Sequence, residues 1–513
     1  MASKGIITSE GTPGKAALAG AAVLSGLLLA AAFPYPDVGV SAWVALVPLI
    51  LVLRTATIRG ALALGYICGL VFFGILFSWC AVFGYAAWAA LVPIQAVFTA
   101  VFSAVAAPMC RRGGWSAVFG VPAAWVAVEW LRALGPLGVS WGALSVSQHR
   151  NLPLLQAAAL GGPYLLSFLV VMGNAAVAEA VSQRRSQSLL ASVVAAAVIV
   201  TAAVGGSARL RLAGMRLGGE EVIVGLAQAG INKEQGGHFS DPEKLMRAYE
   251  RLTRRLAYYH ASMVVWPETT VPGMALRDPW LKHRLSRLAK RTGTALVLGS
   301  FDPADLSAWR AGGGGLQNCV VAFDKHGRAV GRYAKVHLVP FGEYVPVPAS
   351  RFRGFLRRWG VPEEDLVPGR RRDPMMVDGV SIGALVCFES ALCGASRELV
   401  RKGAQILVFV TNDAWFGRTA APYQHLAFSP LRAVETGRYV LRAATTGITA
   451  CCDPYGRVVA AGPLGGEVGM PVRAEIRNGK TPYVVLGDWI VWLSFILAGA
   501  ALLKPGARGT ADA

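Results

Sequence analysis

The chain contains little charge for its length. Only 16% of its 513 residues are Asp, Glu, Lys or Arg, whereas ordinary soluble domains contain about 25%. Carboxylates are scarcest in residues 1–205, where long apolar runs follow one another, and nearly all Asp and Glu lie in residues 219–480. Together with 54% hydrophobic residues and a mean hydropathy of +0.46, this shortage excludes disorder, a small disulfide scaffold and a single soluble fold.

The sequence also lacks the patterns that bind metals. It has 8 cysteines and 7 histidines, but no Cys-x-x-Cys pair and no His/Cys cluster with zinc spacing. We therefore expect no metal and no cofactor. Five cysteines fall in residues 219–480, and in an oxidising compartment an odd number leaves at least one unpaired or paired between chains. The pairing stays open for Cys319, Cys387, Cys393, Cys451 and Cys452.

Eight apolar segments are candidates for membrane-spanning helices, because a span needs about 20 residues. They are residues 15–33, 40–53, 60–80, 88–109, 117–134, 154–180, 188–205 and 484–503. We therefore expect an N-terminal transmembrane domain over 1–205 with about seven spans, an outer domain over 219–480, and one C-terminal span. The first apolar run has no clear small-residue cleavage site, so we expect it to be a retained span.

Basic residues orient these spans. Most Lys and Arg of the short loops lie on the side of the two termini, so the positive-inside rule predicts cytoplasmic termini and an outer domain across the membrane. The residues concerned are Lys4, Lys15, Arg54, Arg59, Arg111, Arg112, Arg184, Arg185, Lys504 and Arg508. This use of positive charge also explains much of the net charge of +20 without nucleic acid as a partner.

Within residues 219–480, short β-branched runs alternate with amphipathic stretches, which is typical of a layered α/β fold. A helix is predicted up to Tyr259, because Ser240 to Glu243 offer a cap, a first-turn proline and an early carboxylate. Turns are predicted at 324–327 and 453–456. Buried strands are predicted over residues 222–226, 262–266, 294–299, 319–323, 329–333, 382–387, 405–410 and 440–446.

Three reactive side chains follow predicted strands: Glu268, Lys335 and Cys387. The carboxyl ends of strands are where catalytic side chains converge in open α/β layers. A lone Cys after an apolar strand is more often a buried small hydrophobe than a nucleophile, and an isolated Lys or Glu is usually solvated. Together, however, a Glu base, a Lys that stabilises an oxyanion and a Cys thiolate form a complete acyl-transfer set.

The motifs around these residues resemble the nitrilase superfamily, which has a Glu-Lys-Cys triad in an αββα sandwich. They are Trp266-Pro267-Glu268, the run from Tyr333 through Lys335 and His337 to Glu343, and Cys387-Phe388-Glu389. The span pattern, Glu129 to Arg132 and Thr411 to Gly417 narrow the resemblance to the membrane-embedded branch, the apolipoprotein N-acyltransferases of the bacterial inner membrane. Phe388 departs from the Tyr that many members place after the nucleophile, so any hydroxyl contact there is absent.

The resemblance implies a reaction and its partners. A fatty acyl chain would pass from a phospholipid to a thioester on Cys387, and then to the α-amine of a diacylglyceryl-cysteine on an apolipoprotein. Glu268 would be the base and Lys335 would hold the oxyanion, with Glu343 and Glu389 orienting this network. The alternative for these last two is an ordinary surface carboxylate. We expect the chain to work as a monomer in the bilayer of the inner membrane, with its catalytic domain in the periplasm.

Other residues are candidates for contacts with substrate. Asn412, Trp415 and Phe416 are expected to line an acyl or head-group pocket together with Trp266, and core packing is the alternative. Residues 351–359 place Phe352, Phe355 and Trp359 at helical spacing among four arginines, which fits an interfacial amphipathic segment that contacts lipid. The alternative is a surface helix packed on the domain.

The remaining polar residues have less specific interpretations. Glu129 and Arg132 lie one turn apart in an apolar run and are expected to form a structural ion pair. His337 and His425 would be needed as bases only in a Cys-His enzyme. For Arg438 and Arg442 the sequence leaves two roles open, as partners in ion pairs or as contacts to a phosphate.

Two competing functions share parts of this pattern. A membrane-anchored nitrilase-like amidase would use the same triad and release acid to water, although seven spans exceed what an anchor needs. A transporter would hold more ionisable residues inside its spans.

Overall fold

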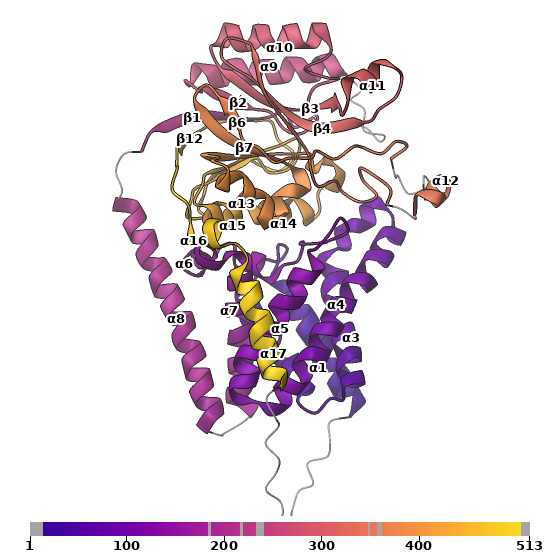
Figure 1. Ribbon diagram of the computed structural model, residues 1–513, viewed down its shortest axis with the longest axis vertical. Helices are drawn as coiled ribbons and strands as arrows, with labels where there is room; N and C mark the ends of the chain where they lie inside the picture. Colours follow the sequence, from indigo (N-terminus) through magenta and orange to yellow (C-terminus); the bar gives the residue numbers. More distant parts are fainter. Residues whose placement is uncertain are drawn as a thin grey trace, which may run out of the picture.

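The computed structural model describes residues 14–182, 186–215, 219–231, 241–346, 349–356 and 362–503. A body of apolar helices forms one end of the molecule and an α/β domain the other (Figure 1). The C-terminal helix α17 (Trp489–Leu503) returns from the α/β domain and runs alongside the helical body.

The helical body follows the apolar segments of the sequence. Its longer helices are α1 (Lys15–Ala31), α2 (Val47–Leu53), α3 (Ile58–Leu76), α4 (Tyr85–Arg112), α5 (Gly114–Arg132), α7 (Ala158–Ser182) and α8 (Ser186–Met215). Short pieces connect them: η1 (Gly39–Trp43), η2 (Ser78–Phe83), η3 (Leu144–Gln148) and α6 (Leu152–Leu155).

Four of the described helices are long and apolar enough to cross a membrane by length and composition: α3, α4, α7 and residues 186–213 of α8. This is fewer than the eight spans predicted. Helices α1 and α17 are shorter, and a turn between η1 and α2 interrupts the segment over residues 40–53.

Contacts at the helix ends define two levels of the body. The carbonyls of Pro34, after α1, and of Leu76, at the end of α3, both accept hydrogen bonds from Gln424 of the α/β domain. At the opposite level, Arg54 after α2 pairs with Glu179 near the end of α7 at 2.6 Å. The chain therefore passes back and forth between a level beside the α/β domain and a far level.

The predicted ion pair in α5 is wrong. Glu129 accepts hydrogen bonds from the backbone N–H of Leu144 at 2.8 Å and from the hydroxyl of Ser167 at 2.8 Å. Arg132 instead donates to the carbonyl of Trp141 at 2.7 Å. Each buried charge thus binds polar groups of neighbouring segments, and these two side chains form no direct ion pair with each other.

Two six-stranded sheets form the centre of the α/β domain. The first has the order β12-β1-β2-β3-β4-β5 and the second β11-β10-β9-β8-β7-β6. In each sheet three neighbouring strands are parallel, β1 to β3 in the first and β7 to β9 in the second, and antiparallel strands flank them.

All eight predicted strands are present: β1 (Glu221–Gln228), β2 (Met263–Val265), β3 (Ala295–Pro303), β4 (Leu316–Phe323), β5 (Ala329–Ala334), β7 (Val380–Val386), β8 (Ile406–Thr411) and β9 (Val440–Ala444). Four strands were not predicted: β6 (Met375–Val377), β10 (Ala450–Cys452), β11 (Val458–Ala461) and β12 (Val468–Glu475).

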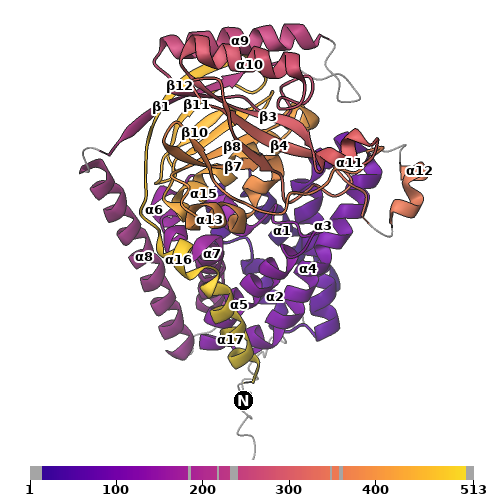
Figure 2. The same ribbon diagram turned by 45° about the horizontal axis from the view of Figure 1, so that its top comes forward.

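The sheets pack face to face between two layers of helices. Val224 and Val265 of the first sheet share a core with Ala384 and Val408 of the second. Helices α9 (Pro242–Tyr258) and α10 (Pro279–Thr292) cover the outer face of the first sheet, while α13 (Cys393–Arg401) and α15 (Phe428–Thr436) lie between the second sheet and the helical body (Figure 2). Helix α9 begins as predicted, because the Asp241 side chain caps it.

The predicted interfacial segment is only partly described. The short pieces η4 (Ala349–Phe352) and α12 (Arg353–Leu356) cover its first six residues and project from the edge of the domain (Figure 1). Phe352 and Phe355 lie in these helices, whereas Trp359 lies outside the described residues.

Candidate active site

The structure brings the three predicted catalytic residues together at the ends of strands. Glu268 follows β2, Lys335 directly follows β5, and Cys387 directly follows β7 at the start of η6 (Cys387–Ala391). Glu268 and Lys335 therefore come from the first sheet and Cys387 from the second. The charges of Glu268 and Lys335 both act on the Cys387 thiol.

Glu268 is almost completely buried, and two hydrogen bonds fix its carboxylate. Its Oε1 accepts from Asn318 Nδ2 at 2.6 Å, and its Oε2 accepts from the backbone N–H of Asn412 at 2.8 Å. Burial raises the pKa of Glu268, while the Lys335 ammonium and these two donors oppose the rise. A carboxylate with a raised pKa is a better proton acceptor than an exposed one.

Lys335 is only 1% exposed and pairs with Glu343, whose Oε2 lies 2.8 Å from Nζ. Burial by itself lowers the pKa of Lys335, but the carboxylates of Glu343 and Glu268 outweigh it and raise the pKa well above its usual value. Asn318 Nδ2 also donates to Glu343 at 3.1 Å, so one amide links both carboxylates. Lys335 therefore stays cationic and can stabilise negative charge, but cannot act as a base.

Cys387 has a backbone conformation that non-glycine residues rarely adopt, with φ at +53°. Burial raises the pKa of its thiol to about 12, and the negative charge of Glu268 contributes, while Lys335 opposes the rise. The resting thiol is therefore protonated at neutral pH. Attack by this sulfur requires that a base remove its proton, and Glu268 is the carboxylate that acts most strongly on it.

Glu389 is fully buried and connects the two sheets. Its carboxylate accepts hydrogen bonds from the Tyr333 hydroxyl and from the backbone N–H groups of Val336 and His337, all in or just after β5. It also accepts one from the N–H of Val386, at the end of β7. Glu389 thus holds the segment of Lys335 against the strand that leads to Cys387.

A second buried network lies behind Cys387. Asp413 Oδ1 lies 2.9 Å from His425 Nδ1, and its Oδ2 accepts from Arg442 at 2.6 Å. His425 Nε2 lies 2.9 Å from the Ser390 hydroxyl and 3.2 Å from the carbonyl oxygen of Cys387. Arg442 is thus an ion partner, and Arg438 donates to backbone carbonyls instead of facing a phosphate site.

An aromatic cluster separates the site from the helical body. The Trp141 ring stacks parallel to that of Phe388 and also contacts Phe416, which in turn meets Trp79. Gln424, in α14 (Ala421–Leu426), accepts from the indole N–H groups of Trp79 and Trp141 at 3.1 and 2.8 Å. With its two donated bonds to the body, its amide makes four hydrogen bonds across the junction.

The other predicted substrate residues have different surroundings. Trp266 has no exposed surface; its ring stacks on Tyr249 of α9 and its indole N–H donates to Thr253. Its placement corrects the predicted substrate contact, because this side chain packs on the outer face of the first sheet, under a helix. The Asn412 side chain caps η7 (Asp413–Phe416). Trp415 is 54% exposed.

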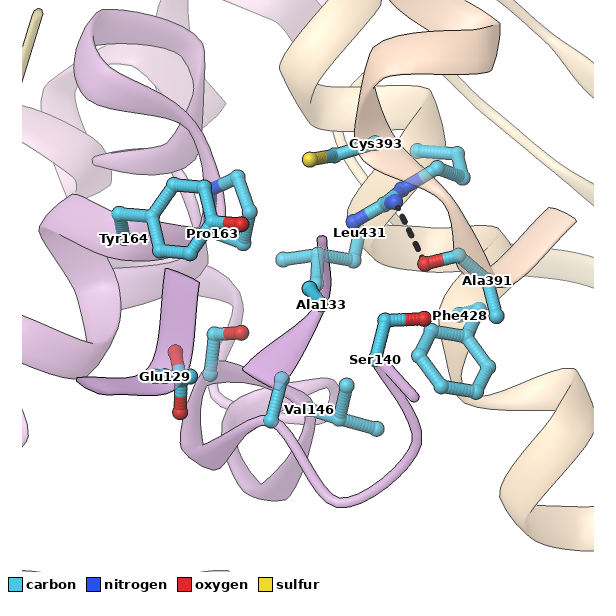
Figure 3. Close-up of a pocket in the computed structure, with 13 residues that line it drawn as sticks. Glu129, Ala133, Ser140, Val146, Pro163, Tyr164, Ala391, Cys393, Phe428 and Leu431 are labelled. Atoms are coloured by element: carbon cyan, nitrogen blue, oxygen red, sulfur yellow. Dashed lines mark hydrogen bonds between the residues drawn. The ribbon is translucent and has the colours of Figure 1, made fainter. Parts of the chain in front are cut away.

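Cys393 lies in a separate place from the triad. It lines a small pocket at the junction with the helical body, and its thiol points toward Tyr164 of α7 (Figure 3). All eight cysteines are free in the structure. Among the described residues, no group of three or more His, Cys, Asp or Glu is placed to hold a metal ion.

Sequence reasoning missed several residues of this site. Asn318 carried one usable signal, because it is a polar residue inside the apolar strand β4. Asp413 lies in the run Thr411 to Gly417 that carries the family resemblance, but the run does not indicate its contact with His425. Ser390 and Gln424 carried no signal, since their partners lie far away in the chain or on the helical body. His425 was noticed and set aside, and the structure gives it contacts with Cys387 and Ser390.

Comparisons with known proteins cover both parts of the molecule. Residues 223–470 match the carbon-nitrogen hydrolase family, and residues 25–176 match the apolipoprotein N-acyltransferase N-terminal domain. The apolipoprotein N-acyltransferase of Geobacter metallireducens is 33% identical over 94% of either chain. That of Gloeobacter violaceus is 31% identical over 94% of this chain and 93% of its own.

An amidase of known structure from Nesterenkonia sp. AN1 is also similar, with 19% sequence identity and a TM-score of 0.37, covering 53% of this chain and 99% of its own. The sequence comparisons alone decide the assignment, because they extend over both the helical body and the α/β domain. The chain belongs to the apolipoprotein N-acyltransferase family.

Proposed function

We propose that the chain moves a fatty acyl group from a phospholipid, through a thioester on Cys387, to the α-amine of the S-diacylglyceryl-cysteine of an apolipoprotein. The observation that carries this proposal is the meeting of a buried base, cation and thiol beside an aromatic cluster that joins the helical body. Lipid substrates that reside in a bilayer can reach a site at such a junction without leaving the membrane.

In the first half-reaction, Glu268 takes the thiol proton as the Cys387 sulfur attacks the ester carbonyl carbon of the phospholipid. Negative charge develops on the carbonyl oxygen, where the Lys335 ammonium stabilises it together with a backbone N–H. When the tetrahedral intermediate collapses, the C–O bond breaks and the lysophospholipid oxygen takes the proton from Glu268. The thioester remains on Cys387.

In the second half-reaction, the α-amine of the diacylglyceryl-cysteine attacks the thioester carbonyl. Glu268 accepts a proton from the amine, the C–S bond breaks, and the released thiolate regains that proton. A thioester suits this order of events because it yields readily to an amine and resists water. Glu343 and Glu389 keep Lys335 in place during both steps.

We further propose that all eight helical passes cross the inner membrane, with both termini in the cytoplasm. Support comes from the two alternating levels of the body and from the basic residues Arg54, Arg111 and Arg112 at the far level, because the positive-inside rule predicts such residues in the cytoplasm. The catalytic domain, over about residues 219–480, then lies in the periplasm. A reporter fused after residue 513 that is active only in the cytoplasm tests this topology, and periplasmic reporter activity contradicts it.

The reaction is tested with the purified protein and phospholipid vesicles. We expect intact and peptide mass spectrometry to find one fatty acyl group on Cys387, and a diacylglyceryl-cysteine peptide to remove it as an amide. A membrane-anchored amidase would instead lose the acyl group to water at the same rate with and without the peptide. An absence of acylation by phospholipid contradicts the proposal.

A further inference from the structure

The backbone between Cys387 and Phe388 is held by a buried polar network that the reaction scheme does not use. The Ser390 hydroxyl donates to the Cys387 carbonyl at 2.8 Å, and His425 Nε2 lies 2.9 Å from that hydroxyl and 3.2 Å from the same carbonyl. Ser390 and His425 are both at most 1% exposed. Water therefore does not replace these contacts.

A rigid partner holds the imidazole in turn. Asp413 lies 2.9 Å from Nδ1, and Arg442 and Thr411 both donate to the same carboxylate, at 2.6 and 2.9 Å. Burial lowers the pKa of His425, as does the Arg442 cation, while Asp413 opposes them. Since the single hydroxyl proton of Ser390 goes to the Cys387 carbonyl, Nε2 of His425 must carry a proton and donate it to the Ser390 oxygen, which keeps the hydroxyl against that carbonyl.

The geometry of a trans peptide connects this network to the chemistry. The carbonyl of Cys387 and the N–H of Phe388 belong to one planar peptide unit, so they point in opposite directions. The N–H of Phe388 lies in the first turn of η6, where N–H groups have no intrahelical acceptor. Fixing the carbonyl on the buried side therefore aims this N–H away from the network, to the face where an acyl oxygen can bind.

We propose that His425 and Ser390 are positioning residues for the oxyanion site, which they build by fixing the Cys387–Phe388 peptide. This inference rests on the proposed acyl transfer. It also accounts for the left-handed backbone of Cys387, with φ at +53°, because a non-glycine residue keeps such a conformation only where its surroundings hold it. His425 thus acts through the backbone of the nucleophile and does not deprotonate its thiol.

The test separates the oxyanion from the nucleophile by using two reactions of Cys387. Acylation by an ester passes through a tetrahedral oxyanion, whereas alkylation by iodoacetamide displaces iodide and forms none. We expect His425→Ala to slow single-turnover acylation about 10- to 100-fold, somewhat less than the loss of a whole oxyanion donor. Alkylation of Cys387, followed by peptide mass spectrometry, should keep the parent rate.

Other variants keep this test decisive. His425→Gln should recover most of the acylation rate, because its amide reaches the Nε2 position and both donates and accepts, although it cannot act as a base. Ser390→Ala removes the hydroxyl with little change in volume and should reproduce the acylation defect if His425→Ala does not fold. Ser429→Ala is the matched control, because this buried hydroxyl of α15 has no partner among the described residues.

The possible outcomes are distinct. If alkylation falls as far as acylation, the network acts on the thiol itself and the inference is overturned, as it also is if neither rate changes. A second acyl donor, p-nitrophenyl butyrate, distinguishes a failure of this inference from a failure of the proposed function. A parent protein that is acylated by this ester but not by phospholipid contradicts the lipid donor, and the variants still test the oxyanion site.

Discussion

Each sheet of the outer domain has three parallel strands flanked by antiparallel ones, yet the first sheet supplies Glu268 and Lys335 and the second supplies Cys387. Two carboxylates link the sheets, because each accepts a hydrogen bond from a backbone N–H that follows a strand of the other sheet. Glu268 of the first sheet accepts from the N–H of Asn412 after the second, and Glu389 of the second accepts from the N–H of Val336 after the first. Hydrogen bonds between the sheets therefore align the charged groups with the nucleophile, in addition to the bonds of Asn318 that position Glu268 and Glu343 within the first sheet.

The largest effect should come from the sulfur that the second sheet contributes. We expect Cys387→Ser to abolish formation of the acyl-enzyme while the protein still folds, because a hydroxyl has a far higher pKa than a thiol and the same carboxylate cannot deprotonate it. Intact mass spectrometry after incubation with phospholipid measures the loss. Cys393→Ala is the matched control and should remain active; an essential Cys393 would mean that the nucleophile lies elsewhere.

A smaller but still large effect should come from the cation of the first sheet. Lys335→Ala should slow single-turnover acylation at saturating phospholipid about 100- to 1,000-fold, the usual cost of losing an oxyanion donor. Lys335→Arg should restore little, because a planar guanidinium does not fit the place of a compact ammonium beside Glu343. Lys402→Ala, on the surface, is the control. Near-parent acylation by the Arg variant would remove Lys335 from the catalytic set.

The connection between the sheets can be weakened without touching either reacting group. In Glu389→Gln, an amide NH2 must face the backbone N–H groups of Val336, His337 or Val386, so at least one buried donor loses its acceptor. This should reduce the free energy of unfolding by about 1–3 kcal/mol and the acylation rate about tenfold. Chemical denaturation and single-turnover kinetics measure the two effects. Parent values for both would show that the sheets align without this carboxylate.

The smallest effect is a shift in pH dependence. Acylation needs ionised Glu268, so its rate should rise with pH through the raised pKa of this group. Asn318 Nδ2 stabilises the ionised form, so Asn318→Ala raises that pKa further and should move the acid limb of kcat/KM to higher pH. Gln317→Ala is the control, since its side chain bonds to Pro368 and Arg332 instead. If the acid limb of the kcat/KM profile of Asn318→Ala stays in place or moves to lower pH, Glu268 is not the base.

The parallel centres of both sheets could be predicted because their strands are buried and apolar throughout, as in β8. The flanking strands could not: β11 is a short and mostly exposed apolar run, β12 is of mixed composition and mostly half-buried, and β6 has only three residues. The triad positions followed from strand ends and motifs. Their support did not, because the contacts of Asn318 with Glu268 and of His425 with Cys387 join segments that only folding brings together.

The four hydrogen bonds of Gln424 tie the active site to the helical body. This amide bonds to segments at the helix ends of the body, and its neighbour in the chain, His425, lies 3.2 Å from the carbonyl of Cys387. Gln424 and His425 are adjacent in the chain, so a single peptide unit couples the helical body to the backbone of Cys387. With the helical body in the bilayer as proposed, this coupling fixes the depth of the Cys387 sulfur relative to the lipid ester groups, and the substrates must move to it.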